Sequence, residues 1–241
     1  MRKLKKELKN TFYNLESPFD SALEAYFYHN IATPLTLHNN YGEPEEMPVE
    51  VFFRDAEELS DIDGIALTFC NGKVLDIGAG TGVHSLPLQE LNIDVTALEL
   101  STMACTIMKE RGVKNIINTS FMADLGQKYD TLLLLMNGFG LAGQLANTKA
   151  FLDQLKRLLN PGGHVIFDSS DVSYMFDEKP TDHYFGEVKF CYEYNHIIGE
   201  WFNWLYIDPD MLLQVAEENG WWAQIIYEDE NDQYLAVLKP N

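Results

Sequence analysis

The clearest chemical signal in this sequence is a short run of glycines that contains one acid. Residues 74–82 read Val-Leu-Asp-Ile-Gly-Ala-Gly-Thr-Gly, so an apolar strand passes directly into glycines. Glycine permits positive φ angles and lets a ligand approach the backbone closely. The free N–H groups at the start of the following helix favour an anionic group. Glu99, at the end of the next expected strand, could accept hydrogen bonds from both hydroxyls of a ribose.

The spacing of these glycines distinguishes between two nucleoside ligands. A dinucleotide-binding loop has the pattern G-x-G-x-x-G around a pyrophosphate, whereas this chain has Gly78, Gly80 and Gly82, with Asp76 just ahead of them. A carboxylate is unfavourable beside a pyrophosphate and favourable beside an α-amino group. S-adenosylmethionine carries an amino group, a carboxylate and a ribose. We therefore predict S-adenosylmethionine as the ligand, with an NAD(P)-dependent oxidoreductase as the less favoured alternative.

The elements that must position these residues alternate between strand and helix from Lys73 onward. Such alternation predicts an α/β fold with a doubly wound, mostly parallel sheet. The expected strands are 74–77, 94–98, 115–119, 131–136, 164–168, 221–227 and 234–238. The expected helices between them are 83–90, 102–111, 148–159 and 209–219, the last of them capped by Asp208.

Two segments do not follow this alternation of strands and helices. Residues 1–67 are expected to form an N-terminal helical cap, with helices at 21–29 and 49–58 and a further short helix capped by Ser60. Residues 68–241 then form the ligand-binding domain. Within it, residues 171–207 are rich in Tyr, Phe and Trp and alternate in polarity, which predicts an antiparallel hairpin insert that turns near 198–199.

The motifs together resemble the class I S-adenosylmethionine-dependent methyltransferase family. The matching segments are the run 74–82, the acid within 95–100, the segment 128–138 and the turn 159–164. The resemblance covers about residues 68–170 and, more loosely, 208–241. It implies a Rossmann-like, seven-stranded sheet whose last strand is antiparallel, and it implies methyltransferase activity. A non-catalytic S-adenosylmethionine-binding protein is the alternative, because the family has no fixed catalytic residue.

The resemblance assigns three groups of residues to the cofactor. One group lines the methionine portion, a second holds the ribose and the adenine, and a third lies beside the sulfonium at the carboxyl end of the fourth strand. These residues are Asp76, Gly78, Ala79, Gly80 and Gly82 for the methionine portion, Glu99 for the ribose, Leu100, Met103, Ser120 and Phe121 for the adenine, and Asn137 and Gly138 for the sulfonium. The family often has an acid where this chain has Ser120 and Phe121.

Composition limits the class of methyl acceptor. The chain has 17 Lys and Arg against 37 Asp and Glu, a formal net charge of −20, and nucleic-acid binding depends on basic residues that replace counterions. Nucleic acid is therefore unlikely as a partner. The run 137–140 also lacks the Asn/Asp-Pro-Pro-aromatic motif of enzymes that methylate the exocyclic amines of bases. A small-molecule acceptor is the expectation, with a protein side chain as the alternative.

The aromatic insert is the expected wall of the acceptor pocket. An aromatic-lined concavity with a few polar groups is typical of small-molecule sites, and it also suits a cationic acceptor. The candidate general bases are His183, Tyr184, Tyr194 and His196, and the candidate substrate contacts are Tyr41, Tyr192, Trp201 and Trp204. The alternative is that these aromatic side chains belong to the core or to the face of a homodimer.

The remaining composition indicates a cytoplasmic protein. The three cysteines, Cys70, Cys105 and Cys191, are far apart and odd in number, which fits neither a disulfide framework nor a zinc site. We therefore expect reduced thiols and no metal. No apolar run approaches the roughly 20 residues that span a bilayer, and the basic N-terminus is not followed by the apolar segment of a secretory signal. No membrane association is expected.

Overall fold

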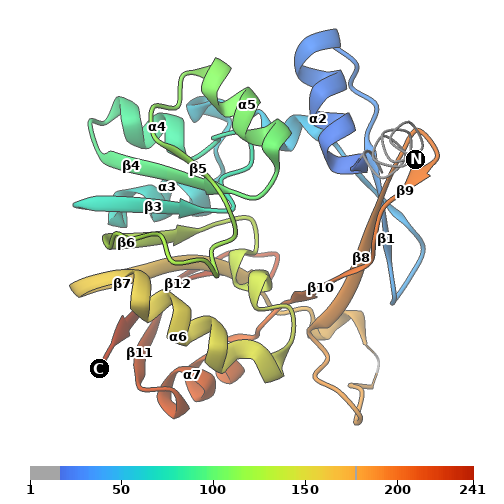
Figure 1. Ribbon diagram of the computed structural model, residues 1–241. Coiled ribbons are helices and arrows are strands. Elements are labelled where there is room, and N and C mark those ends of the chain that lie inside the picture. Colours follow the sequence, from blue (N-terminus) through green and yellow to red (C-terminus); the bar gives the residue numbers. More distant parts are fainter. Residues whose placement is uncertain (1–16, 177) are drawn as a thin grey trace, which may run out of the picture.

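A seven-stranded sheet flanked by helices and a smaller antiparallel sheet lie on opposite sides of the molecule (Figure 1). They are seen in a computed structural model that describes residues 17–176 and 178–241. No helix in these two ranges is both long and apolar enough to cross a membrane. The candidate site lies between the two sheets.

The large sheet has the strand order β11-β12-β7-β6-β3-β4-β5. Neighbours from β7 through β5 are parallel, while β12 runs antiparallel to both β7 and β11. This confirms the predicted mostly parallel sheet with one antiparallel strand. Its strands are β3 (Lys73–Ile77), β4 (Asp94–Glu99), β5 (Ile116–Asn118), β6 (Tyr129–Leu134), β7 (Leu159–Ser170), β11 (Trp221–Glu228) and β12 (Gln233–Pro240).

Helices cover both faces of this sheet because its central strands are apolar on both sides. Leu132 and Leu134 of β6 pack in the cluster that includes α6 (Thr148–Leu158) and α7 (Pro209–Glu218). Leu133, between them, packs on the opposite face with α3 (Asp61–Phe69) and α4 (Ser85–Glu90). Side chains alternate across a strand, so a continuous apolar run buries both faces. α5 (Thr102–Arg111) packs against the β4 and β5 edge.

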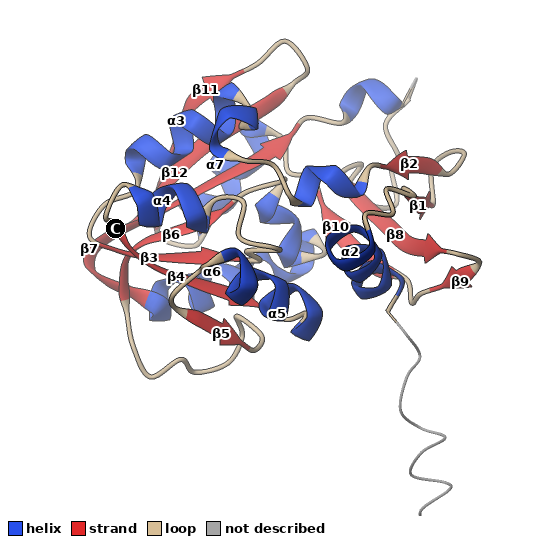
Figure 2. Cartoon of the chain, turned by 90° about the horizontal axis from the view of Figure 1, so that it is seen from above, coloured by secondary structure: helices blue, strands red, loops and turns tan. Residues whose placement is uncertain are grey.

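The small sheet joins two segments that are far apart in the sequence. Its order is β10-β8-β1-β2, and β9 pairs with β8. β1 (Leu35–Asn39) and β2 (Glu45–Met47) come from the N-terminal segment, whereas β8 (Glu187–Tyr194), β9 (Ile197–Ile198) and β10 (Phe202–Leu205) come from the aromatic insert. α2 (Pro18–His29) packs against β8, and Figure 2 shows it beside the small sheet when the molecule is viewed from above.

The N-terminal segment differs from the predicted helical cap. The helix expected at 21–29 is present as α2, and Ser60 caps α3 as predicted. The helix expected at 49–58 is instead two 3₁₀ turns, η1 (Val49–Phe52) and η2 (Ala56–Glu58), and strands β1 and β2 were not predicted. β1 pairs with β8, about 150 residues later in the chain, so no local pattern around β1 reveals its partner.

The hairpin of the insert also turns earlier than predicted. Asn195 and His196 both have positive φ, 48° and 66°, between β8 and β9. Two successive residues with positive φ form a two-residue turn that matches the twist of the strands. The predicted turn at Ile198–Gly199 was therefore wrong by about three residues, because Gly199 was taken as the turn residue. A turn of this type usually contains glycine, and here Asn195 and His196 replace it.

Candidate active site

The three glycines of the loop after β3 are required for two different reasons. Gly78, Gly80 and Gly82 all have positive φ, 75°, 57° and 91°. A Cβ on Gly78 or Gly80 would meet no atom closer than 3.9 Å, so neither glycine is required by close packing, and both line the cavity described below. A Cβ on Gly82 would lie 2.8 Å from Cγ2 of Val113. Gly82 therefore allows close packing inside the protein, and it does not face the ligand space as the resemblance implied.

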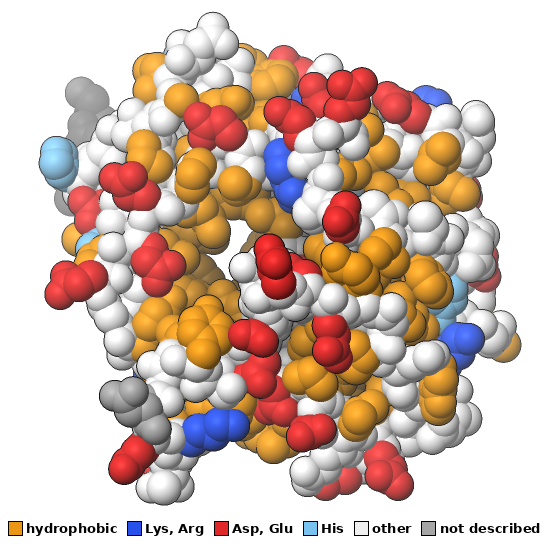
Figure 3. All heavy atoms as spheres, turned by 180° about the vertical axis from the view of Figure 1, so that it is seen from behind, with side chains coloured by type: hydrophobic (Ala, Val, Ile, Leu, Met, Phe, Trp, Pro, Cys, Tyr) orange, Lys and Arg blue, Asp and Glu red, His pale blue; other side chains and the backbone are white. Residues whose placement is uncertain are grey.

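A cavity of about 600 Å³ lies between this loop and the small sheet. It is bounded by residues from β3, β4, the turn that follows β6 and the small sheet. In Figure 3 hydrophobic side chains surround a hollow in the surface, with acidic side chains around it. The predicted site residues that line the cavity are Asp76, Gly78, Ala79, Gly80, Glu99, Asn137, Tyr192 and Trp204. The structure thus brings the expected cofactor loop and part of the expected acceptor wall to one cavity.

Two acids at the ends of β3 and β4 form one side of this cavity. Asp76 is buried and accepts a 2.6 Å hydrogen bond from the Ser85 hydroxyl. Burial raises the pKa of Asp76, partly offset by His84 and Ser85. Glu99 accepts from the backbone N–H of Gly80 at 2.9 Å. A buried carboxylate is costly without a partner, so Asp76 is poised to receive a cationic group.

The Glu99 carboxylate is held in place by three backbone donors. Besides Gly80, the N–H groups of Leu100 and Ser101 donate to its other oxygen at 2.7 and 2.8 Å. Burial raises the pKa of Glu99, and these hydrogen bonds oppose the rise. Each carboxylate oxygen has about two lone-pair sites, so Glu99 retains capacity for further donors. α2 closes this end, because Asp20 accepts a 2.6 Å hydrogen bond from the Ser101 hydroxyl.

One arginine and no lysine lie among the described residues that line the cavity, and the sequence analysis did not identify this arginine. Arg54 donates a 2.8 Å hydrogen bond to Oδ2 of Asp63, while His84 Nε2 lies 3.0 Å from Oδ1. Ser60 adds donors from its N–H and its hydroxyl. Burial works against ionisation of Asp63, but His84, Ser60 and Arg54 together hold its pKa below the usual range. No motif marks Arg54, which falls between the two 3₁₀ turns.

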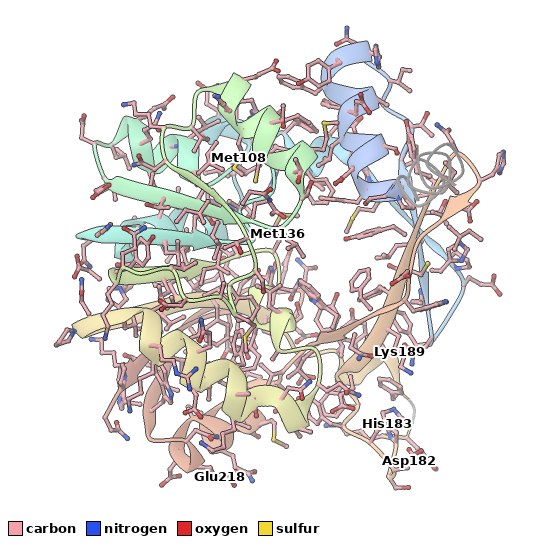
Figure 4. The ribbon with its side chains drawn as sticks, viewed as in Figure 1. Met108, Met136, Asp182, His183, Lys189 and Glu218 are labelled. Atoms are coloured by element: carbon pink, nitrogen blue, oxygen red, sulfur yellow. The ribbon has the colours of Figure 1, made fainter. Side chains whose placement is uncertain are left out.

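The chain reverses sharply after β6 and brings Asn137 to the cavity. Met136 and Asn137 have positive φ, 64° and 57°. The Ser170 hydroxyl donates to the Asn137 side-chain oxygen at 2.8 Å, and the buried Asp168 accepts from the N–H of Gly138 at 3.1 Å. Figure 4 shows Met136 beside the space that separates the two sheets. Gly138 itself is buried against Leu134 and does not line the cavity.

One face of the small sheet forms the opposite wall. Leu37 lies opposite both Tyr192 and Glu45, and Phe190 lies opposite Phe202, so these side chains share a face. The two residues that continue this alternation are Trp204 and Tyr206. The aromatic side chains of this face that line the cavity are Phe190, Tyr192, Phe202, Trp204 and Tyr206. We refer to these five side chains as the aromatic wall.

The aromatic wall is packed onto the loop that follows β6. A Cβ on Gly140 would lie 2.0 Å from the Trp204 ring, so only glycine leaves room for the indole there. Sequence reasoning identified the insert and two of its residues, Tyr192 and Trp204. It missed Phe190, Phe202 and Tyr206, which the alternation of β8 and β10 could have identified once the turn was placed correctly.

None of the four candidate bases lines the cavity. The His196 side chain is fully exposed in the turn, and His183 pairs with Asp182 on the loop before β8, away from Met136 (Figure 4). The Tyr184 hydroxyl donates to the Asp208 carboxylate and accepts from the Asp208 N–H, which fixes the start of α7. The Tyr194 hydroxyl is buried and has no hydrogen-bond partner among the described residues. We therefore withdraw all four as general bases.

Two of the four predicted substrate contacts also lie outside the cavity lining. The Trp201 side chain is largely exposed, at 56%. Tyr41 is not in the lining, but its hydroxyl donates a 2.8 Å hydrogen bond to Glu45, which is. The expected adenine contacts lie beyond Glu99 and outside the lining as well. Leu100 is exposed there, whereas Phe121 packs edge-to-face on Phe151.

Comparison with known proteins decides the family. The profile of a methyltransferase domain matches residues 52–223. The chain belongs to the class I S-adenosylmethionine-dependent methyltransferases. It resembles a crystal structure of an S-adenosylmethionine-dependent methyltransferase from Bacteroides fragilis in complex with S-adenosyl-L-homocysteine, at 34% identity and a TM-score of 0.86, over 93% of this chain and 95% of that one. The oxidoreductase alternative is thereby set aside.

Two further comparisons give weaker likenesses, one in structure and one in sequence. The glycopeptide N-methyltransferase MtfA in complex with S-adenosylmethionine is 17% identical, with a TM-score of 0.55 over 79% of this chain and 96% of that one. That likeness shows the fold alone. The cypemycin N-terminal methyltransferase of Streptomyces sp. is 29% identical over 102 residues, which are 41% of this chain and 42% of the relative. The match therefore spans less than half of that relative's length.

Proposed function

We propose that this methyltransferase binds S-adenosylmethionine along the glycine loop and transfers its methyl group to a small molecule held by the aromatic wall. The single observation that carries the proposal is that one cavity is lined by Gly78 and Gly80 on one side and by Tyr192 and Trp204 on the other. Its volume of about 600 Å³ falls within the range of roughly 300–1,000 Å³ that small-molecule pockets occupy.

The charges in the cavity fit the charges of the cofactor. Asp76 would receive the α-ammonium group, and Arg54 would receive the carboxylate, because it is the one Lys or Arg side chain in the described lining. Glu99, fixed by three backbone donors, would accept from the ribose hydroxyls. Leu100 would cover the adenine, since its side chain is 71% exposed beside Glu99. Ser120, Phe121 and Met103 remain candidates only for the outer part of the adenine site.

The reaction needs positioning more than acid–base chemistry. In methyl transfer the acceptor atom attacks the methyl carbon in line with the departing sulfur, and the C–S electron pair returns to the sulfur. Holding both reactants in this geometry supplies much of the catalysis. Asn137, fixed by Ser170 and carried on the sharp turn after β6, would lie beside the sulfonium. The aromatic wall would hold the acceptor across from it.

Calorimetry with S-adenosylhomocysteine and with NAD tests the cofactor assignment. We expect micromolar binding of S-adenosylhomocysteine and no binding of NAD. Trp204→Ala tests the acceptor wall, because it should leave affinity for S-adenosylhomocysteine unchanged and remove methyl transfer to any accepted substrate. If Trp204→Ala weakened S-adenosylhomocysteine binding as strongly as Glu99→Ala, the wall would belong to the cofactor site and the division proposed here would fail.

A further inference from the structure

The charges that line the cavity are strongly one-sided. The described lining includes the carboxylates Glu45, Glu46, Asp63, Asp76, Glu99 and Asp168 and one Lys or Arg side chain, Arg54. Asp63 already pairs with Arg54. If the cofactor takes Asp76, Arg54 and Glu99 as proposed above, the rest of the described lining contains carboxylates and aromatic faces, and its one histidine, His84, is already paired with Asp63. An acceptor with a negative charge would be repelled from such a surface.

Glu45 is the carboxylate on the acceptor side of the cavity. It shares a sheet face with Leu37 and Tyr192, because Leu37 pairs with both. Its Oε1 accepts hydrogen bonds from the Tyr41 hydroxyl at 2.8 Å and from Asn39 Nδ2 at 3.2 Å. Although Glu45 is exposed at the cavity mouth, these two donors fix one of its oxygens and leave the other available.

Two phenols of the aromatic wall point to the same ligand chemistry. The hydroxyls of Tyr192 and Tyr206 hydrogen-bond no other described residue, so both are available to a ligand. Burial raises the pKa of Tyr206 above its usual range, and Glu45, Tyr192 and Asp168 contribute to the rise. Burial and the nearby Glu99 likewise raise the pKa of Tyr192 to about 12. Both phenols therefore stay neutral and can accept a hydrogen bond from an N–H group.

We infer that the acceptor atom is the nitrogen of a primary or secondary amine carried on an apolar body. This inference rests on the proposed function, because it assigns a substrate class to the same cavity. An ammonium group is attracted to the faces of aromatic rings, at about 0.5–2 kcal/mol each. The Glu45 carboxylate adds an ion-pair partner at the mouth. The apolar body would lie against the rings of Phe190, Phe202 and Trp204, which line the cavity.

The direction of charge movement strengthens this assignment. As the amine lone pair forms the new N–C bond, the C–S bond breaks and its electrons go to the sulfur. The positive charge therefore leaves the sulfonium and develops on the nitrogen, next to the aromatic wall. Fixed groups that stabilise charge where it develops in the transition state lower the barrier. The wall and Glu45 would stabilise the positive nitrogen more than they stabilise the neutral amine.

The proton balance needs no dedicated base inside the cavity. The amine arrives as an ammonium ion and loses one proton to water at the open mouth, beside Glu45, before it attacks. The methylated product is an ammonium ion, and S-adenosylhomocysteine is the neutral thioether product. An alcohol or phenol would instead have to lose its proton to become a strong nucleophile. The only histidine in the described lining, His84, already pairs with Asp63 through Nε2.

A panel of matched compounds tests the inference on the full-length protein. Each carbon skeleton is supplied as the amine, the alcohol and the carboxylate, for example 2-phenylethylamine, 2-phenylethanol and 3-phenylpropionate. Thermal shift is measured with S-adenosylhomocysteine bound, and methyl transfer is measured with S-adenosylmethionine. We expect binding and transfer to be confined to amines. A tripeptide that begins with phenylalanine is added to the panel, once with a free and once with an acetylated N-terminus. It shows whether the α-amine of a peptide is accepted as well as the amine of a small molecule.

Two variants connect the panel to the residues that carry the inference. Glu45→Gln should weaken binding of the amines about two- to fivefold, the range expected for an exposed ion pair, and affinity for S-adenosylhomocysteine should not change. Glu43→Gln removes the same charge from an exposed neighbour outside the cavity lining. It should change neither the affinity for the amines nor the affinity for S-adenosylhomocysteine. Alcohols or carboxylates that bind as well as the amines, or a panel in which no amine binds, would overturn the inference. Failure to bind S-adenosylhomocysteine would instead overturn the proposed function.

Discussion

Arg54 and Asp63 form a 2.8 Å ion pair at the edge of the cavity, and His84 holds the other oxygen of the same carboxylate. The pair connects the 3₁₀ turns, the capped start of α3 and the helix that follows the glycine loop. Asp63 is buried whereas Arg54 is about one-fifth exposed. The guanidinium has more than one N–H edge, so it can keep Asp63 and still bind a ligand carboxylate.

Arg54→Gln should weaken S-adenosylhomocysteine binding by about 1.5–3 kcal/mol, the usual contribution of a hydrogen bond between charged groups. Calorimetry measures this directly. 5′-Methylthioadenosine lacks the amino acid portion, so its affinity should be the same for the variant and the parent. Arg157→Gln, at an exposed position on α6, is the matched control. Equal losses for both ligands would show that Arg54 supports the fold and not the carboxylate.

Glu99→Ala should weaken cofactor binding by about 2–4 kcal/mol, because hydrogen bonds from two ribose hydroxyls are lost. The structure adds a second effect, since Gly80, Leu100 and Ser101 would each lose a backbone hydrogen-bond partner. We expect the variant to fold but to have a lower melting temperature without ligand. Differential scanning calorimetry and titration separate the two effects. A variant that binds cofactor like the parent would place the ribose elsewhere.

Asp76→Asn should weaken cofactor binding while leaving the free energy of unfolding at pH 7 equal to that of the parent or higher. Burial raises the pKa of Asp76 in the folded protein, so the folded state binds its proton more readily than the unfolded chain does. Its contribution to stability therefore grows as pH falls through the raised pKa. Urea unfolding of both proteins at pH 7 and pH 5 measures this. Only the parent should gain free energy of unfolding from Asp76 at the lower pH. A large loss of stability at pH 7 would show that the charge is needed for folding.

Gly140→Ala should displace the Trp204 ring, because the new Cβ would lie 2.0 Å from it. Overpacking of this kind costs about 1–3 kcal/mol of stability, and acceptor binding should fall with it while S-adenosylhomocysteine affinity is kept. Gly64→Ala on α3 is the control, since a Cβ there meets nothing within 4 Å. It should stabilise the helix by about 0.5–1 kcal/mol. Unchanged acceptor binding in Gly140→Ala would remove Trp204 from the wall.

The large sheet and the cofactor side of the cavity were predictable because their signals are local. An apolar strand, three glycines and an acid about 20 residues later occur together in the sequence, and the structure brings Asp76, Gly78, Gly80 and Glu99 to one cavity. Gly82 shows the limit of such a motif. A glycine can be needed because a neighbour such as Val113 packs closely against it, or because a ligand must approach the backbone. Spacing alone does not distinguish these two reasons.

The acceptor side was harder to predict because it depends on pairing between distant segments. β1 reaches the aromatic wall only by pairing with β8, and nothing near Leu37 in the sequence indicates that partner. Tyr192 and Tyr194 lie on the same face of β8, but Tyr194 is the last residue of the strand and is buried in the cluster that includes α2, whereas Tyr192 lines the cavity. Position along β8 decides between these two tyrosines, and the sequence pattern, which is the same for both, does not.

The most direct test of the central claim is a crystal structure of the full chain with S-adenosylhomocysteine bound. We expect the ribose hydroxyls to lie within hydrogen-bond distance of Glu99, the carboxylate to meet Arg54, and the sulfur to face the aromatic wall across an open space. A sulfur that faces closed protein, with the aromatic wall filled by the adenine or by a second subunit, would contradict the claim that one cavity holds both the methyl donor and its acceptor.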